Sequence, residues 1–412
     1  MIKINKSLPG PRVKDTLARF EKSIGLYDPP YPFVYGGKGS GVYCEDLDGN
    51  VFMDWASQIA CQPLGYSHPK MIEVAQKYAA RAPLKLAGHD YFSLEHLELM
   101  EELVSILPKE LNAVFLINSG AEAIENAIKV AYRKRPSAKI GISVQGAFHG
   151  RTLGALSCTN SKSIQKKNYP EIHIRRITLN HAEELERLLK HDVHPENVAF
   201  VLVEAIQGEG GYRFADTQWL RDIRKITQEH EIIMIVDEVQ AGLGRTGSWW
   251  AFERAGIVPD IITSAKALQV AATIGRKELF PTESGSISST WGRGDLIHMA
   301  MGCAIIKTIK EDGLLENIKQ RGDYLLKKLL ELQKKYPIIL NPRGAGLFIA
   351  FDLPNAELRN KLVERNFHKG LLTLGCGSQS LRVIPPYIIT NAEIDEGLAI
   401  IEQNLGELMR GT

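Results

Sequence analysis

The chain has 412 residues, of which 44% are hydrophobic and 24% are charged, which is enough for one large core or two domains. Its 50 basic and 48 acidic residues leave a net charge of +2, so no broad charged surface favours nucleic acid or an anionic membrane as a partner. The N-terminal sequence lacks the apolar stretch of a secretory signal, and no apolar run approaches the roughly 20 residues that span a bilayer.

The predicted elements, in chain order, begin with two short strands over residues 41–55 around a turn at Asp48-Gly49. From about residue 70 to 310, short apolar strands alternate with helical patterns, which indicates βαβ units and a mostly parallel sheet. The strands are expected at 113–118, 139–144, 199–206, 232–236 and 260–265, and the helices at 120–134, 181–190, 217–230 and 295–311.

Beyond about residue 312 the pattern changes to a long charged helix, the strand-like segments GLFIAFDL and SLRVIPPY, and a final helix. This predicts a smaller α+β domain over 312–412, which the N-terminal segment 1–48 joins, and a large α/β domain over 49–311. Ligands of open α/β sheets bind beyond the carboxyl ends of the strands, so the polar residues at those ends are the candidates for a site.

Asp237 and Glu238 directly follow the apolar run 232–236, and a carboxylate at the inner end of a buried strand requires a cation. That cation could be Mg²⁺ in a P-loop ATPase, a structural Arg or Lys, or the protonated ring nitrogen of a pyridine cofactor. The magnesium interpretation needs a G-x-x-x-x-G-K-[ST] loop. The closest candidate, Gly37-Lys38, lacks the earlier glycine and the following Ser or Thr.

Ser119 precedes an amphipathic helix and, with Glu122, forms a capping-box pattern in NSGAEAIENAIKV. The free N–H groups of Ser119-Gly120-Ala121 and the helix dipole suit a phosphate, although a capped helix without a ligand is the alternative. In QGAFHGRTLG, Phe148 beside His149 could stack on a flat cofactor. In the same segment Arg151 could bind a carboxylate, or could be an ordinary surface arginine.

Lys266 follows the apolar segment IITSA and lies among small and apolar residues. Desolvation would lower its pKa and prepare it to form a Schiff base, whereas a lysine that extends to solvent is the alternative. Glu204 and Glu209 flank a turn after another strand, either as acid/base groups or as turn caps. A phosphate cradle, an aromatic ring, an aspartate for a pyridinium and a Schiff-base lysine are together what pyridoxal 5′-phosphate requires.

Several motifs resemble those of the class III (ω-amino acid) aminotransferases, pyridoxal-phosphate enzymes of fold type I, the aspartate-aminotransferase type. They are NSGAEAIENA, GAFHGRT, EAIQGEGG, VDEVQAGLGRTG, the strand-end lysine and STWG. The resemblance runs from about residue 30 to the end of the sequence. Two departures stand out. The usual glycine-rich run after the lysine is ALQVAA here, and the iron–sulfur cysteines of animal 4-aminobutyrate enzymes are absent from NSGAEA.

The resemblance implies a role for each matched residue. Lys266 would hold the cofactor as a Schiff base, Asp237 would pair with the ring nitrogen, and Gln240 would reach the ring hydroxyl. Glu204 would help to position the residues around the cofactor ring. Thr290 would reach the phosphate of the cofactor in the neighbouring subunit, which implies a homodimer. The implied cofactor-binding residues are Ser119, Gly120, Ala121, Phe148, His149, Asp237, Gln240, Lys266 and Thr290.

The resemblance also implies the substrate-binding residues. Arg151 would bind the distal carboxylate of 4-aminobutyrate, and Arg382, in SLRVIPP, would take the α-carboxylate of glutamate. Glu209 would neutralise Arg382 while an ω-amine donor is bound and would move aside for glutamate. Ile59 would line the donor side.

The expected reaction moves the terminal amine of 4-aminobutyrate to 2-oxoglutarate and gives succinate semialdehyde and L-glutamate. L-Lysine 6-aminotransferase is the first alternative, because KALQVAATIGRKEL and NPRGAGLFIAFDLP resemble the lysine enzymes as much as the 4-aminobutyrate enzymes. β-Alanine and ornithine are further donors, and a pyridoxal-phosphate amino-acid racemase is the alternative from another class. Five scattered cysteines without a CxxC pair argue against a zinc site and suit a reducing cytoplasm. We therefore expect a cytoplasmic protein without a metal. The resemblance implies a homodimer, with a tetramer of paired dimers as the alternative.

Overall fold

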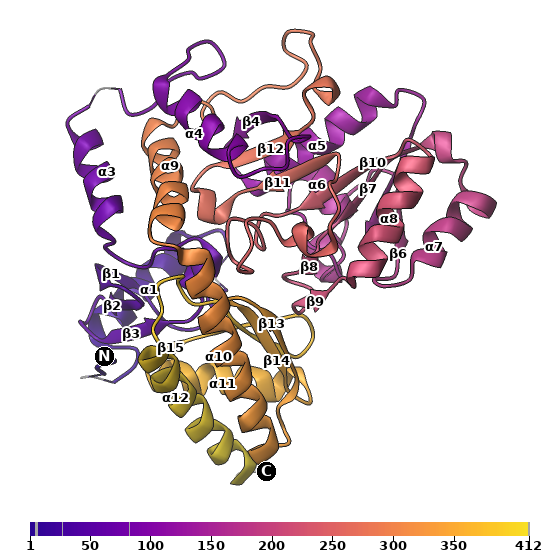
Figure 1. Ribbon diagram of the computed structural model, residues 1–412. Helices are drawn as coiled ribbons and strands as arrows, with labels where there is room; N and C mark the ends of the chain where they lie inside the picture. Colours follow the sequence, from indigo (N-terminus) through magenta and orange to yellow (C-terminus); the bar gives the residue numbers. More distant parts are fainter. Residues whose placement is uncertain (5–6, 27, 82, 411–412) are drawn as a thin grey trace. The chain divides into compact units, whose positions relative to one another are not determined.

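The computed structural model describes residues 1–4, 7–26, 28–81 and 83–410. The chain divides into two units, the first formed by residues 1–72 and 316–412 and the second by residues 73–315 (Figure 1). Residues 49–72, which the sequence analysis assigned to the large domain, fall in the first unit. The reason is that β3 (Val51–Asp54) pairs with β2 (Tyr43–Asp46) on one side and with β15 (Leu371–Leu372) on the other.

The second unit is built on a seven-stranded sheet. In sheet order its strands are β4 (Ala113–Ile117), β12 (Ala271–Gly275), β11 (Ile261–Ser264), β10 (Ile233–Asp237), β7 (Val198–Val203), β5 (Ile140–Val144) and β6 (Ile174–Ile177). All neighbours from β11 to β6 are parallel, whereas β12 runs antiparallel to both β11 and β4. The predicted α/β class with a mostly parallel sheet is therefore confirmed.

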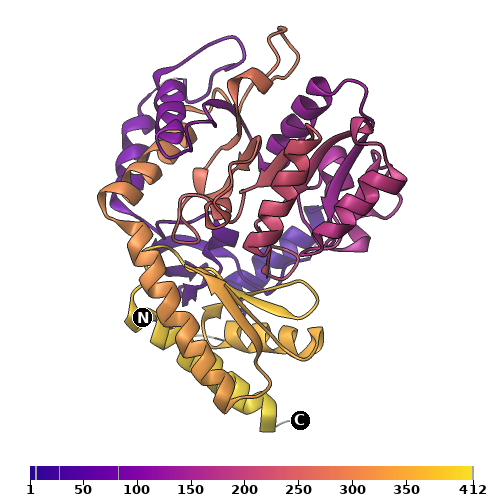
Figure 2. The same cartoon turned by 45° about the vertical axis from the view of Figure 1, so that its right-hand side comes forward.

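Helices cover both faces of this sheet (Figures 1 and 2). Val201 and Val203 of β7 belong to the core cluster of one face, and Phe200 and Leu202 belong to the cluster of the other, as the alternation of a strand requires. The first face packs against α4 (Leu94–Val104), α7 (Ala182–Arg187), α8 (Thr217–Glu229) and α9 (Leu296–Glu311), and the second against α5 (Gly120–Lys134) and α6 (Leu153–Cys158). Both faces are apolar, so the strands are buried runs of Val, Ile, Leu and Phe.

Most predicted elements of this unit are confirmed. The helix predicted over 120–134 is α5 with the same ends, because Ser119 caps its first turn. Helix α7 is shorter than predicted, since it ends at Arg187 and continues as a π-helical turn over Leu188–Asp192. Two strands of the seven-stranded sheet lie outside the predictions. Strand β6 has the sequence IRRI and β12 has the sequence AATIG, and neither carries the long β-branched run that identifies a strand.

The first unit contains two four-stranded sheets. One consists of β1 (Tyr35–Ser40), β2, β3 and β15, and the other of β13 (Leu340–Ala345), β14 (Phe348–Asp352), β17 (Ser380–Val383) and β16 (Leu374–Cys376). The hairpin predicted around Asp48-Gly49 is confirmed by the antiparallel pairing of β2 with β3. The segments GLFIAFDL and SLRVIPPY provide β14 and β17, as predicted.

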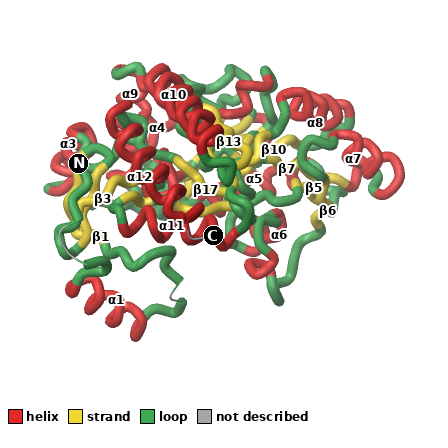
Figure 3. Tube along the Cα trace, turned by 90° about the horizontal axis from the view of Figure 1, so that it is seen from below, coloured by secondary structure: helices red, strands yellow, loops and turns green. Residues whose placement is uncertain are grey.

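The helices of the first unit are concentrated in its C-terminal part. They include α11 (Ala356–His368) and α12 (Asn391–Arg410), which pack on each other, and α10 (Leu314–Lys335), the long charged helix expected from the sequence. Figure 3 shows these helices in red and the strands β13 and β17 in yellow. The remaining elements are α1 (Pro11–Ser23), α2 (Ser57–Ala60), α3 (Pro69–Ala79), β8 (Ile206–Gln207) and β9 (Arg213–Phe214). Within the described ranges, no helix has both the length and the apolarity needed to cross a membrane.

Candidate functional site

The N-terminus of α5 forms one wall of the candidate site in the second unit. The Oγ atom of Ser119 accepts a hydrogen bond from the Glu122 N–H at 3.3 Å, which confirms Ser119 as the N-cap. The Glu122 carboxylate accepts from the Ser119 hydroxyl, through Oε2 at 2.9 Å. A Cβ atom on Gly120 would lie 2.9 Å from Val239 Cγ1 and 3.5 Å from Ala265 Cβ. The helix therefore begins directly against the two segments that carry Asp237 and Lys266.

Asp237 is the last residue of β10, and its carboxylate is buried and fully engaged. Oδ2 lies 2.8 Å from His149 Nδ1, so the imidazole N–H donates to it. Oδ1 accepts from the Val239 N–H at 3.0 Å and from Thr263 Oγ1 at 3.2 Å. These three donors fix the direction of the carboxylate. The sequence placed His149 in the site but gave no signal that it contacts Asp237, because the two residues lie 88 positions apart.

Lys266 stands in the turn between β11 and β12. Asp237 pairs with Thr263 in the sheet, so Lys266 follows three residues after the position that neighbours Asp237. Its φ of 50° is left-handed, and its carbonyl accepts the Gln269 N–H at 3.0 Å, which closes a tight turn. Such a backbone is strained for a lysine, and strain of this kind is found mainly at functional positions. The chain then doubles back into the antiparallel β12.

Glu204 links the loops that follow β5 and β7. Its Oε1 accepts the Phe148 N–H at 3.0 Å and its Oε2 accepts the Gly208 N–H at 2.9 Å. Burial raises the pKa of Glu204 to about 7, the charge of Asp237 adds to the rise, and His149 opposes it. The predicted positioning role therefore has a physical basis, because this carboxylate holds the loop that carries Phe148 and His149.

The residues present fit pyridoxal 5′-phosphate. Within the described part of the chain, His149 Nε2 and Gln240 Oε1 are buried without a hydrogen-bond partner, so this pocket has polar atoms left to satisfy. The α5 N-terminus offers N–H groups to a phosphate, and Asp237 offers a buried negative charge to a ring nitrogen. Among the described side chains, no three His, Cys, Asp or Glu residues gather where they could hold a metal.

The predicted substrate-binding residues of this unit have the following contacts. The guanidinium of exposed Arg151 lies 5.8 Å from the centre of the Phe148 ring. Glu209 Oε1 lies 2.8 Å from Lys162 Nζ, with 17% of the Glu209 side chain and 49% of the Lys162 side chain exposed. The sequence gave no signal for Lys162, since a lysine in the polar run TNSKS is typical of any surface loop. Pairing of Glu209 with Arg382 stays a prediction.

Thr290 lies on an exposed segment near the end of β4. Its carbonyl accepts the Gly88 N–H at 2.9 Å. A Cβ atom on Gly292 would overlap the main chain at Ile117 and Asn118, so the loop packs closely there. Contact of Thr290 with a neighbouring subunit stays a prediction.

Arg382 and Ile59 belong to the first unit. Arg382 is buried in β17 and its Nη2 donates to the Gly375 carbonyl at 3.0 Å. A cavity of about 500 Å³ in this unit is lined by Pro30, Tyr31, Phe33, Tyr35, Asp54, Ala56, Gln58, Ile59, Gln62, Tyr66, Leu372 and Leu374. Burial raises the pKa of Tyr31, and the charge of Arg382 opposes that rise, so Arg382 lies within electrostatic range of the cavity wall.

The Ile59 segment of this cavity has an unusual backbone. Four consecutive residues, Ser57 to Ala60, have φ values of 45°, 51°, 58° and 66°, although none is glycine. Left-handed backbone costs an L-residue about 1–2 kcal/mol, so other contacts must hold the turn. The sequence SQIA contains no glycine or asparagine that could have predicted it.

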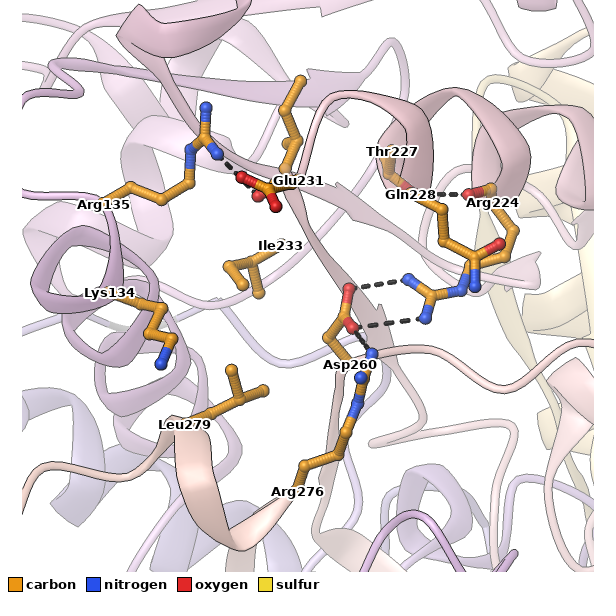
Figure 4. Close-up of a pocket in the computed structure, with 11 residues that line it drawn as sticks. Lys134, Arg135, Arg224, Thr227, Gln228, Glu231, Ile233, Asp260, Arg276 and Leu279 are labelled. Carbon is orange, nitrogen blue, oxygen red and sulfur yellow. Dashed lines mark hydrogen bonds and ion pairs between the residues drawn. The ribbon is translucent and has the colours of Figure 1, made fainter.

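A second cavity lies at the opposite ends of the strands, near the start of β10 (Figure 4). It is lined by four basic side chains, but these are already paired. Arg224 donates to Asp260 through both terminal nitrogens, at 2.7 and 3.2 Å, and Arg276 contacts the same carboxylate. Arg135 donates to the carbonyls of Val198, Pro195 and Glu231. These charges therefore tie the strand ends together, and the cavity is a structural one.

The chain matches a family model described as aminotransferase class-III over residues 27–405. The acetylornithine aminotransferase of Caldanaerobacter subterraneus subsp. tengcongensis is 34% identical over 382 residues, which cover 90% of this chain and 94% of that protein. The 5-aminovalerate aminotransferase DavT of Pseudomonas putida is 32% identical, covering 99% of this chain and 100% of that protein. The alanine/serine racemase of Pyrococcus horikoshii is 31% identical, with coverages of 98% and 92%.

A solved structure of an aminotransferase is also similar to nearly the whole chain. The lysine aminotransferase from M. tuberculosis in the internal aldimine form matches with a TM-score of 0.87 and 28% identity, covering 96% of this chain and 98% of that one. Proteins similar to nearly the whole chain thus carry names with different amino substrates.

Proposed function

Because this chain belongs to the class-III aminotransferases, a family that depends on pyridoxal 5′-phosphate, we propose that it moves the terminal amino group of an ω-amino acid to 2-oxoglutarate. The first donor in this proposal is 4-aminobutyrate, which would give succinate semialdehyde and L-glutamate. The observation that carries the proposal is the buried His149–Asp237 pair, one strand from the Lys266 turn and beside the start of α5.

When bound, pyridoxal phosphate supplies an aldehyde that takes up the amino group and a ring that accepts the electron pair released at the substrate carbon. The chain's own residues prepare this chemistry. The Asp237 carboxylate would face the ring nitrogen and favour its protonated form, and His149 holds the Oδ2 atom of Asp237 in place. Lys266 would hold the cofactor, and its Nζ atom, once free, could carry a proton as a general base.

The proposal assigns the substrate carboxylates to two arginines. Arg151 would bind the distal carboxylate of 4-aminobutyrate, and Arg382 would bind the α-carboxylate of glutamate. Glu209 would neutralise Arg382 when the donor has no α-carboxylate, and Ile59 would contact the donor chain. The proposal includes a cytoplasmic homodimer in which Thr290 reaches the phosphate of the neighbouring site. Dimer and tetramer differ in mass, so light scattering tests this part.

Three other functions compete with this proposal. L-Lysine as the donor is supported by the similarity to a lysine aminotransferase structure, and 5-aminovalerate by the similarity to DavT. Racemisation is supported by the similarity to an alanine/serine racemase. A racemase would return the proton to the α-carbon of the same amino acid and would need no keto acid.

A half-reaction experiment separates these functions. The purified holoenzyme is mixed with one donor at a time, without keto acid, and the absorption band of the lysine-bound cofactor is followed. We expect 4-aminobutyrate to remove the band and 2-oxoglutarate to restore it with formation of glutamate. Loss of the band with lysine or 5-aminovalerate alone would move the assignment to that donor. Formation of D-alanine from L-alanine without keto acid would overturn transamination, and Lys266→Ala is the control that must lack both band and turnover.

A further inference from the structure

The left-handed turn at Ser57–Ala60 must be imposed by its surroundings, because its own residues disfavour it. In a left-handed helix the Cβ atom of an L-residue approaches the following carbonyl oxygen, so single residues adopt this conformation and runs are avoided. Gln58 and Ile59 have φ/ψ values of 51°/46° and 58°/49°, which are those of a true left-handed helical turn. Strain that survives in a native structure is held by neighbouring contacts and concentrates at ligand sites.

Asp54 supplies the contacts that hold this turn. It ends β3, pairs with Leu372 of β15, and has only 1% of its surface exposed. Its Oδ1 accepts the Ala56 N–H at 2.8 Å, and its Oδ2 accepts the Gln58 N–H at 3.1 Å and the Tyr66 hydroxyl at 2.7 Å. Gln58 Nε2 in turn donates to the Tyr66 hydroxyl at 2.9 Å, which closes a ring of hydrogen bonds. One buried carboxylate thus fixes both the entrance and the second residue of the turn.

The turn presents Ile59, whose surface is 42% exposed, to the 500 Å³ cavity of the first unit. Ile59 lies between Gln58 and buried Ala60, and its exposed apolar surface lines the cavity, where the apolar chain of a ligand could cover it. The lining of this cavity also includes three aromatic residues, Tyr31, Phe33 and Tyr35. Aromatic and aliphatic side chains, with Arg382 within electrostatic range of Tyr31, suit a carboxylic acid with a short apolar chain.

We propose that Asp54 is a positioning residue that holds the left-handed turn, so that Ile59 forms a wall of the amino-donor pocket and limits the length of the donor chain. This inference rests on the proposed function in one respect, the contact between Ile59 and the donor. The turn itself and its dependence on Asp54 do not require any particular reaction.

The kinetic test replaces one atom of the ring of hydrogen bonds. Asp54→Asn keeps one acceptor oxygen and turns the other into a donor, which opposes the Gln58 N–H and removes the acceptor of the Tyr66 hydroxyl. We expect KM for 4-aminobutyrate, or for the donor that the half-reaction identifies, to rise about tenfold, while kcat changes less than about twofold. Ile59→Ala should raise the same KM and should improve longer donors relative to shorter ones.

A glycine at the second position of the turn tests the mechanism. Glycine adopts the left-handed region without strain, so Gln58→Gly should recover at least roughly threefold of the KM that Asp54→Asn loses. An unchanged donor KM in Asp54→Asn would overturn the proposal. The proposal would also be overturned if Asp54→Asn lowered kcat and raised KM for the donor and KM for 2-oxoglutarate to the same extent, without rescue by Gln58→Gly. Such a result would indicate that the whole fold is damaged. If Asp54→Asn does not fold, Tyr66→Phe removes a single donor and should still raise the donor KM.

A second readout is independent of activity. The thiol introduced by Ile59→Cys is labelled with a small maleimide in a Cys61→Ser background, since the other four cysteines are buried. Asp54→Asn should change the labelling rate several-fold, and Gln58→Gly should restore it. If the labelling rate is the same with and without Asp54→Asn, the inference is overturned, even if the wild type transaminates. If the wild type turns over no donor but labelling responds as expected, the proposed function fails while the role of Asp54 in the turn stands. Labelling that responds while the donor KM does not would overturn the assignment of Ile59 to the donor pocket.

Discussion

His149 Nδ1 donates to Asp237 Oδ2 at 2.8 Å, and both side chains are buried. A buried carboxylate with a fixed donor on one oxygen cannot rotate, so its remaining charge points in a defined direction. In a dry site such a fixed charge acts more strongly on a nearby cation than it would in water. The contact with His149 therefore fixes the orientation of the Asp237 carboxylate before a ligand binds.

Replacing His149 should separate this orienting role from simple packing. The side-chain nitrogen of His149→Asn can occupy the place of Nδ1, whereas His149→Gln extends toward the place of Nε2. We expect kcat within about tenfold of the wild type for His149→Asn and a loss of about 10²–10³-fold for His149→Gln. The pH dependence of the cofactor absorption band provides the second measurement, because a misplaced Asp237 would no longer favour the protonated ring. Equal activity of the two variants would show that the Nδ1 contact does not matter.

Arg151 is expected to recognise a carboxylate by its charge and by its planar pair of N–H groups. Arg151→Ala should raise KM for 4-aminobutyrate by about 10–100-fold, since a charged hydrogen-bonded pair is lost. Arg151→Lys keeps the charge but loses the planar pair of N–H groups, so its KM for 4-aminobutyrate should lie between those of the wild type and Arg151→Ala. KM for 2-oxoglutarate serves as the internal control. A KM for 4-aminobutyrate that ignores Arg151→Ala would reject the carboxylate assignment.

The Lys162–Glu209 ion pair should influence the choice between substrates. The proposed function has Glu209 neutralise Arg382 when no α-carboxylate is bound. Because Lys162 attracts Glu209 away from this role, removal of Lys162 should favour the proposed pairing and hinder binding of an α-carboxylate. Because Lys162 is half-exposed, the pair is worth at most about 1 kcal/mol, which corresponds to an increase of up to about fivefold in KM for L-glutamate in Lys162→Met. The increase should shrink in high salt. It should vanish in a Glu209→Gln background, and persistence there would exclude Glu209 as the mediator.

Glu238 should make the stability of the protein fall as the pH rises. Its Oε2 and Oε1 accept the N–H groups of Ala251 and Phe252 at 3.0 and 2.9 Å, but burial raises its pKa to about 8. Since the folded protein holds the proton more tightly than the unfolded chain, the contribution is fully present below about pH 4.5 and is lost by about pH 8.

Urea unfolding between pH 5 and pH 9 measures this effect. Glu238→Gln cannot ionise and should flatten the profile relative to the wild type. Glu357→Gln is the matched control, because Glu357 is exposed and its pKa is lowered by Lys361. A wild-type profile that rises across this range, or one that Glu238→Gln leaves unchanged, would show that Glu238 is ionised throughout.

The parts of the fold that the sequence predicts are those controlled by neighbouring residues. Helix α5 was predicted with both ends because its apolar residues recur at helical spacing, and Ser119 marks its start as a local N-cap. Strand β12 was not, because AATIG is short and small, and only its pairing with β11 and β4 on both sides makes it a strand. The unit boundary shifted for the same reason, since the partner of β3 lies more than three hundred residues away in β15.

The site divides in the same way. Asp237 and Lys266 were predicted as site residues because each follows an apolar run, which is visible in the sequence. The contact of Asp237 with His149 depends on how two loops meet above the sheet, and no local pattern reports it. The left-handed turn at Ser57–Ala60 depends on Asp54 and Tyr66, and its own residues favour another conformation.

The pairing of β3 with β15 also sets an order of events during synthesis. Met53 pairs with Leu371, so this pairing cannot form until Leu371 has left the ribosome. Leu371 emerges roughly 300 residues after Met53, which takes about 15–60 s at ordinary elongation rates. All of residues 73–315 emerge in that interval, so the second unit can fold while the edge of β3 is still open. An open strand edge is a template for pairing with other chains. Newly made protein should therefore depend on chaperones most during this interval, and variants that slow the closure of β3 should aggregate as they are made although the finished fold tolerates them.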